Sequence, residues 1–157
     1  MYFELDLTNE STLEALRKCQ LLPNKGRLKN VLPKRLYKRL KRHLRYIRKM
    51  MAVWLRDLES DFQFRSGTYQ SYADNLYQHL TMNWVRKRPI WVMLMVNSLT
   101  ESDIKSRGIP VLDQYLASKA LKDRKEIGAV ESVEEQCKPL NALNNTQVSH
   151  LYAKRVK

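Results

Sequence analysis

The stretch PKRLYKRLKRHLRYIRKMMAVWL, residues 33–55, constrains the fold more than any other part of the sequence. Its apolar residues recur at helical spacings of three and four, which places them on one face of an α-helix. Pro33 fits the first helical position. Such an amphipathic helix must pack its apolar face against the rest of a domain. The members of this predicted stripe are Leu36, Leu40, Leu44, Ile47, Met51 and Leu55.

The same stretch dominates the charge of the chain. Residues 15–56 hold 15 of the 29 Lys and Arg and no Asp or Glu, so the rest of the chain sums to −2 within a net charge of +13. We interpret the basic side as a solvated face. An anionic membrane surface or an acidic glycan stays open as a partner, because electrostatic attraction requires no motif.

Nucleic acid is the third partner that such a basic stretch could have. The aromatic residues Tyr37, Tyr46 and Trp54 are interleaved with the charges, as base stacking would require. They are few, however, and no known nucleic-acid-binding motif accompanies them. We therefore do not expect nucleic acid to be the partner.

Periodicity and turn residues predict a mixed α/β fold that is rich in helix. Alternation over Tyr2–Leu7 predicts a short strand, and AVES, residues 129–132, a second extended segment. The length of 157 residues suits one domain. Residues 57–67 are expected to form a loop. A helix is expected at TLEALRKC, with Thr8 or Asn9 as its cap. Besides this helix and the one at 33–55, helices are expected at residues 69–86, 89–100, 111–126 and 134–140.

The predicted inward faces of two of these helices follow from their spacing. In residues 69–86 they are Tyr72, Leu76, Leu80 and Trp84, and in residues 111–126 they are Leu112, Tyr115, Leu116 and Ala120. The run at 89–100 is apolar throughout, so its periodicity does not separate helix from strand. Pro89 at its start and its Met and Leu content favour helix.

Few residues point to chemistry by themselves. Glu4 and Asp6 share one face of the predicted strand, where a carboxylate can act as a ligand or general base; the alternative is a solvated edge strand. His43, His79 and His150 are widely separated, and no Gly-x-x-His or HExxH motif is present. The histidines therefore predict no assembled metal site.

The two cysteines and the ends of the chain bear on the cellular compartment. Cys19 and Cys137 are compatible with a long-range disulfide or with two buried thiols, and we favour thiols until a compartment is established. The start MYFELDL does not have the pattern of a signal peptide. The longest uncharged apolar run has 12 residues, short of the ~20 that cross a bilayer.

Three stretches together resemble a known family. They are residues 1–23, residues 86–120, which contain WVMLMVNSLTESDIKSRGIPVLD, and residues 128–144, GAVESVEEQCKPLNALN. They are similar to the TIKI proteins, Wnt-inactivating metalloproteases of the TraB/GumN superfamily. The resemblance runs from residue 1 to about Val148, is weakest over residues 55–77, and is lost in the divergent residues 149–157. It implies a single partial domain over residues 1–157, the central part of a TraB/GumN-like (EreA/ChaN-like) catalytic domain.

The resemblance also implies an activity. The complete protein is expected to be a glycosylated, membrane-anchored, extracellular-facing protease that uses manganese or cobalt to cleave amino-terminal residues from Wnt proteins, and so regulates Wnt signalling negatively. Glu4 matches a strand-end Glu of the family, which reverses the solvated-edge interpretation and implies a role as catalytic residue or metal ligand. Glu131 and Gln136 match a Glu and Gln pair that follows a helix in the family.

The departures from the family pattern carry expectations of their own. The family's two Gly-x-x-His motifs lie outside this chain, so we expect the 157 residues alone to be inactive. An extracellular setting makes Cys19 and Cys137 disulfide candidates, and Asn9 and Asn144 glycosylation candidates. The alternative function is a non-catalytic basic helical module that binds polyanions, namely heparan-type glycans, anionic lipid or nucleic acid.

Overall fold

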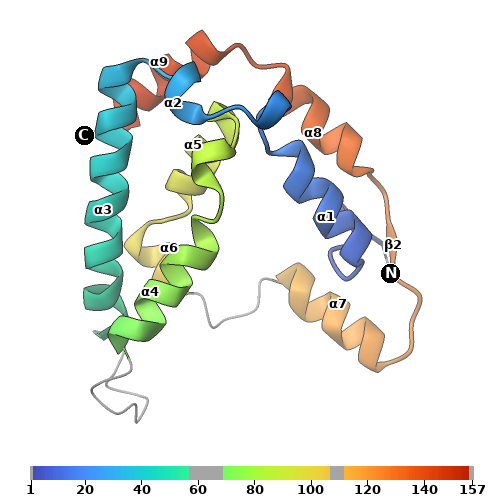
Figure 1. Cartoon of the computed structure of the whole chain (residues 1–157). Helices are drawn as coiled ribbons and strands as arrows, with labels where there is room; N and C mark the ends of the chain where they lie inside the picture. The colour runs from blue at the N-terminus through green and yellow to red at the C-terminus, as the bar shows by residue number, and fades with distance from the viewer. Residues whose placement is uncertain (1, 57–68, 107–111, 156–157) are drawn as a thin grey trace. The chain divides into compact units, whose positions relative to one another are not determined.

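The computed structural model describes residues 2–56, 69–106 and 112–155. These residues form mostly helix, with one small sheet (Figure 1), which confirms the predicted helix-rich α/β class. The chain divides into two compact units. The first unit comprises Met1–Leu21 and Gly108–Leu143, and the second comprises Leu22–Arg107 and Asn144–Lys157. The expectation of a single partial domain over residues 1–157 stays a prediction.

The second unit is built around α3, Lys34–Arg56. This long helix packs against α2 (Leu28–Val31), α4 (Tyr69–Leu80), α6 (Glu101–Lys105) and α9 (Asn145–Arg155). A further helix, α5 (Pro89–Asn97), packs against α9, and two 3₁₀ turns, η1 (Pro23–Lys25) and η2 (Trp84–Arg86), complete the described elements of the unit. No helix among the described residues is long and apolar enough to span a membrane.

Burial along α3 confirms the predicted stripe and corrects its last member. Leu55 is half-buried, and Trp54 is buried in its place, because a step of three from Met51 keeps the side chain on the inward face. Trp54 is therefore a core residue and is not available for base stacking. The buried members of the stripe are Leu36, Leu40, Leu44, Ile47, Met51 and Trp54.

The stripe is expected to dominate the stability of the chain. Leu40 is 0% exposed, so the Leu40→Ala variant should lower the free energy of unfolding by about 2–5 kcal/mol through lost burial and a residual cavity. The adjacent exposed Lys41→Ala is the matched control and should change it by no more than about 0.5 kcal/mol. Urea unfolding followed by circular dichroism measures both. Equal effects of the two variants would contradict this assignment of the core.

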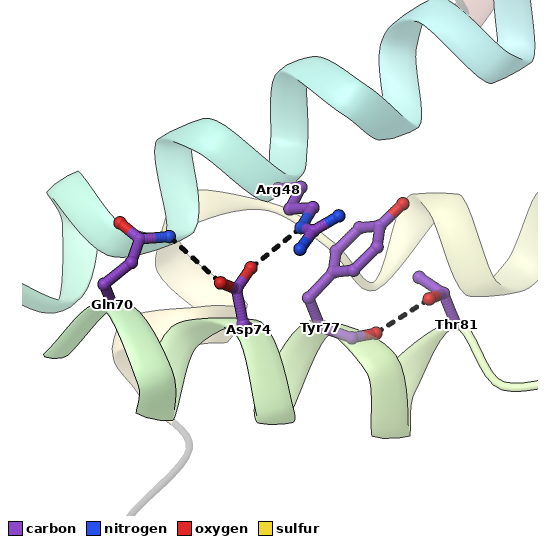
Figure 2. Close-up of polar contacts among 5 residues, drawn as sticks. All are labelled: Arg48, Gln70, Asp74, Tyr77 and Thr81. Carbon is purple, nitrogen blue, oxygen red and sulfur yellow. Dashed lines mark hydrogen bonds and ion pairs between the residues drawn. The ribbon is translucent and has the colours of Figure 1, made fainter. Parts of the chain in front are cut away.

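One ion pair joins α3 to α4 at the edge of this core. The Arg48 guanidinium donates to Asp74 Oδ1 at 2.7 Å and lies 5.9 Å from the centre of the Tyr77 ring, as Figure 2 shows. Gln70 donates a second hydrogen bond to the Asp74 carboxylate at 3.3 Å. These two bonds, led by the one from Arg48, lower the pKa of Asp74 below its usual value.

The lowered pKa predicts a pH dependence of stability. Because the folded-state pKa of Asp74 lies below its unfolded value, the stabilisation is present above the unfolded pKa and is lost as the pH falls through the folded pKa. Asp74→Asn should therefore lower the free energy of unfolding at neutral pH. The difference from the wild type should disappear as the pH falls. Asp123→Asn, at an exposed position after α7, is the control. If the difference in the free energy of unfolding between Asp74→Asn and the wild type stays constant from neutral to acid pH, Asp74 does not contribute to the pH dependence of stability.

Two predicted helix boundaries in the second unit needed correction. The helix predicted at 69–86 ends at Leu80, because Asn83 adopts a left-handed conformation with φ of 59° and Trp84 begins η2. Its predicted inward residue Tyr72 is exposed, whereas the adjacent Ala73 is buried. The helix predicted at 89–100 is confirmed as α5, which ends three residues earlier than predicted, at Asn97. The loop predicted at 57–67 lies outside the described residues.

The first unit contains a two-stranded parallel sheet. Its elements are β1 (Tyr2–Phe3), α1 (Glu10–Cys19), α7 (Leu112–Lys122), β2 (Gly128–Ala129) and α8 (Val133–Asn141). The strand predicted over 2–7 stops at Phe3, and Leu7 is 46% exposed. Asn9 is the N-cap of α1, as expected: its side-chain oxygen accepts from the amide of Ser11. In α7, Ala120 is buried as predicted, but Tyr115 is 53% exposed.

Candidate functional site at the end of the parallel strands

The two strands bring Glu4 and Glu131 together. Tyr2 pairs with Gly128 and Phe3 with Ala129 in parallel register. Beyond this pair, the amide of Val130 donates to the carbonyl of Phe3 at 2.9 Å, and the amide of Glu131 donates to the carbonyl of Glu4 at 3.0 Å. The backbones of the two glutamates are thus hydrogen-bonded just after the carboxyl ends of both strands.

This edge is a common place for a site in parallel sheets, because ligands bind outside the carboxyl ends of the strands. The side chains of Glu4 and Glu131 are both exposed there. Asp6, expected to share a strand face with Glu4, instead belongs to a local turn: its Oδ1 accepts from the amide of Thr8 at 3.0 Å and from the Thr8 hydroxyl. The site therefore includes Glu4 without Asp6.

A capped helix follows Glu131 directly. Ser132 is the N-cap of α8, and its hydroxyl accepts from the amide of Glu135, whose carboxylate accepts from the amide of Ser132 at 2.7 Å. These hydrogen bonds lower the pKa of Glu135. Gln136 lies in the first turn, where its amide donates to the carbonyl of Ser132 at 3.3 Å and its side chain is half-buried. The capping box thus fixes the course of the chain between Glu131 and Gln136.

A disulfide ties α8 to α1. Cys19, the last residue of α1, is bonded to Cys137 of α8, with Cα atoms 6.3 Å apart and a sequence separation of 118. Next to it, the side-chain amide of Asn141 donates to the carbonyl of Cys19 at 3.0 Å. Since α8 follows Glu131, this bond also limits the freedom of the segment that carries Glu131 and Gln136.

Reduction of this bond is expected to destabilise the first unit. Closing so long a loop restricts the unfolded chain, so Cys19→Ser/Cys137→Ser should lower the free energy of unfolding by about 2–5 kcal/mol. Urea titrations with and without a reductant measure the effect. The reductant should destabilise the wild type and leave the double variant unchanged. A wild type that is equally stable in both conditions would show that the disulfide contributes nothing.

The described residues do not complete a metal site. Among them, no three His, Cys, Asp or Glu side chains lie close enough together to hold an ion. Glu4 and Glu131 belong to the first unit, whereas the three histidines lie on helices of the second, His43 on α3, His79 on α4 and His150 on α9. Burial lowers the pKa of His43. Catalytic zinc sites typically use three protein ligands, so the two glutamates alone do not fit a complete catalytic metal centre.

The two predicted glycosylation sites both begin helices. Asn9 and Asn144 are exposed. The Asn9 side-chain oxygen accepts from the Ser11 amide at 2.9 Å and from the Ser11 hydroxyl at 2.7 Å, and that of Asn144 accepts from the Thr146 amide at 2.9 Å. In both cases the side-chain oxygen makes the capping bond. Their glycosylation stays a prediction.

Comparison with known proteins gives this geometry a family context. Residues 1–156 match the TraB/PrgY/gumN family. The chain is 59% identical over 148 residues to a metalloprotease TIKI homolog of Nematostella vectensis, covering 94% of this chain and 31% of that protein. It is 56% identical to the human metalloprotease TIKI1, covering 94% and 28%. A metalloprotease TIKI homolog of Amphimedon queenslandica is 36% identical, covering 92% and 28%.

These matches confirm the resemblance to the TIKI proteins over most of the chain. The chain spans about three tenths of the length of these curated relatives. No solved structure matches it significantly. The strand pattern indicates Glu4 as a candidate and the family resemblance supports it, whereas Glu131 and Gln136 rest on the resemblance alone. No local pattern in the sequence marks the backbone contact between the two glutamates.

Proposed function

The chain belongs to the TraB/PrgY/gumN family, and from this premise we propose that it supplies Glu4 and Glu131 to the catalytic site of a metal-dependent protease. One observation carries the proposal: the hydrogen bond between the Glu131 amide and the Glu4 carbonyl joins these residues at the carboxyl end of the parallel strands. The relatives' names support the protease class, since each of those reported is called a metalloprotease TIKI or a homolog of one.

The two glutamates have distinct expected roles. Glu4 directly follows β1 and is exposed, so its carboxylate is placed to take a proton from an attacking water or to bind an ion, as a general base or a ligand. Glu131 follows β2, and its amide is hydrogen-bonded to the carbonyl of Glu4. Gln136, half-buried in α8, is a candidate to position the substrate or Glu131. In this proposal Gln136 is a positioning residue.

The metal, substrate and location are proposed for the complete protein. The metal is manganese or cobalt, the substrate is the amino-terminal region of a Wnt protein, and the enzyme faces the outside of the cell from a membrane anchor. Two carboxylates do not complete a catalytic metal centre, and the described residues offer no group of three ligands. We propose that the further ligands are the histidines of the two Gly-x-x-His motifs that the family resemblance places outside this chain. We therefore propose that the isolated chain does not cleave.

A cleavage assay on the complete protein tests the roles of the glutamates. Glu4→Gln is expected to lower kcat/KM on a purified Wnt by about 10²-fold or more, the range of a lost general base. Glu131→Gln is expected to lower it as well. Glu134→Gln, an exposed glutamate in the first turn of α8, is the matched control and should retain the wild-type rate. Full activity of Glu4→Gln would end the proposal.

The inactivity of the isolated chain has its own experiment. The 157 residues and a version extended at both ends are each incubated with a Wnt and manganese, and the Wnt amino terminus is read by mass spectrometry. Cleavage by the extended form alone is the expected result. Cleavage by the 157 residues would show that they hold a complete site.

A further inference from the structure

The outer side of α3 carries a straight row of cations that the proposed protease site does not use. We call Arg35, Lys38, Arg42, Arg45 and Lys49 the basic row. Their spacings of three, four, three and four place them on one face of the helix, and at 3.6 residues per turn this face lies opposite the buried stripe. All five side chains are exposed. At ~1.5 Å per residue, the row extends over about 21 Å.

Within the described part of the chain, no ion pair joins an acidic side chain to the row. The helix α3 contains no Asp or Glu, and its ion pair with α4 uses Arg48, which lies outside the row. The second unit as a whole holds 22 Lys and Arg against six Asp and Glu, whereas the first unit holds seven against ten. A polyanion is therefore attracted to the second unit and repelled by the unit that carries Glu4 and Glu131.

Two hollows at the start of the row offer shaped positions for an oxyanion. One, of about 350 Å³, is lined by Arg35, Lys38, Arg39 and Arg42. The other, of about 530 Å³, lies between α3 and α9 and adds hydroxyl and imidazole groups to the guanidinium groups. Arginine presents a planar fork of donors that suits anionic oxygens. The lining residues of the second hollow are Pro33, Arg35, Leu36, Arg39, Thr146, Ser149 and His150.

We propose that the basic row and these two hollows bind a linear sulfated glycan of the heparan type. A straight array of exposed cations matches a chain whose charges repeat along its length, and the hollows give individual sulfate groups hydrogen-bond donors. This binding surface belongs to the second unit and shares no residue with the proposed protease site. It would concentrate the protein at glycan-bearing surfaces without taking part in cleavage.

The structure favours a glycan over a lipid surface. A helix that lies on a membrane inserts its apolar face, with cations at the interface. In α3 the apolar face is buried in the second unit, and Tyr46 is the large hydrophobic side chain of this helix that is strongly exposed.

The structure also favours a glycan over nucleic acid, because base stacking requires accessible aromatic rings. Trp54 is buried, and the ring of Tyr37 stacks on that of Trp84 of η2, with centroids 5.7 Å apart. Of the three aromatic residues interleaved with the charges, Tyr46 alone is left exposed. The row therefore offers contacts for charge and few for bases.

Heparin binding by the full 157-residue chain tests the proposal. The row variant Lys38→Gln/Arg42→Gln/Arg45→Gln/Lys49→Gln should weaken binding of a heparin octasaccharide by about tenfold or more at physiological salt. The dependence of Kd on salt should also become less steep, because fewer charge contacts release fewer counterions on binding. The control neutralises four exposed lysines of the first unit: Lys119→Gln/Lys122→Gln/Lys125→Gln/Lys138→Gln. It carries the same net charge and should bind nearly as wild type.

Two further measurements separate the outcomes. A Lys38→Arg/Lys49→Arg variant keeps the charge and should keep the binding, and circular dichroism should show that every variant is folded. Equal weakening in the row variant and the control would overturn the proposal, since net charge alone would then explain the binding. Tighter binding of the wild type to phosphatidylserine vesicles or single-stranded DNA than to heparin would overturn it as well. A wild type that does not bind heparin is the third contradicting result.

Discussion

The burial of the α3 stripe is the interaction on which the second unit depends. Adjacent like charges on a helix destabilise it by about 0.2–0.5 kcal/mol per pair, so the basic row costs about 1–2 kcal/mol. Each buried apolar side chain of the stripe contributes about 1.5–3 kcal/mol, and the stripe has six of them. Burial therefore exceeds repulsion several-fold. A helix without a single carboxylate can persist because its inner face is fully used.

This balance leaves the outer face of α3 available for function. The packing of α4, α6 and α9 uses the inner face and its flanks, and Arg48 is joined to Asp74 at the boundary. The cations of the basic row remain exposed on the opposite side, and none of them takes part in an ion pair among the described residues. Their alignment on one face of the helix is not required by the packing of the core. This face is therefore available to bind a partner.

The first unit depends on different forces. A parallel pair of two-residue strands is too short to be stable by itself. The disulfide and the Asn141 bond to Cys19 join α1, which follows β1, to α8, which follows β2, and the capping box at Ser132 fixes the start of α8. A site at the end of this strand pair is thus supported by a disulfide and by polar contacts. In a larger sheet, the hydrogen bonds between the strands would give this support.

Local patterns predicted the helices well and the contacts between distant segments poorly. The spacing of Leu36 to Met51 predicts α3, and the side chain of Asn9 predicts a helix cap, because each signal depends on residues no more than about one turn apart. The helix at 69–86 was predicted too long, since the left-handed turn at Asn83 leaves the apolar spacing unchanged. The residues alone favour buried thiols for Cys19 and Cys137, and only the family resemblance makes them disulfide candidates; the structure joins them. The bond from Glu131 to Glu4 joins two segments that are far apart in the sequence and leaves no periodic pattern in either of them.

Amide hydrogen exchange at Val130 and Glu131 is the most direct test of the claim that parallel pairing assembles the glutamate site. Both amides donate to carbonyls of the first strand segment, at 2.9 and 3.0 Å, so both should exchange more slowly than in an unstructured peptide. Slow exchange that is lost when the disulfide is reduced would agree with the account in full. Exchange of both amides at the rate of a free peptide, with α1 and α8 still protected, would contradict it.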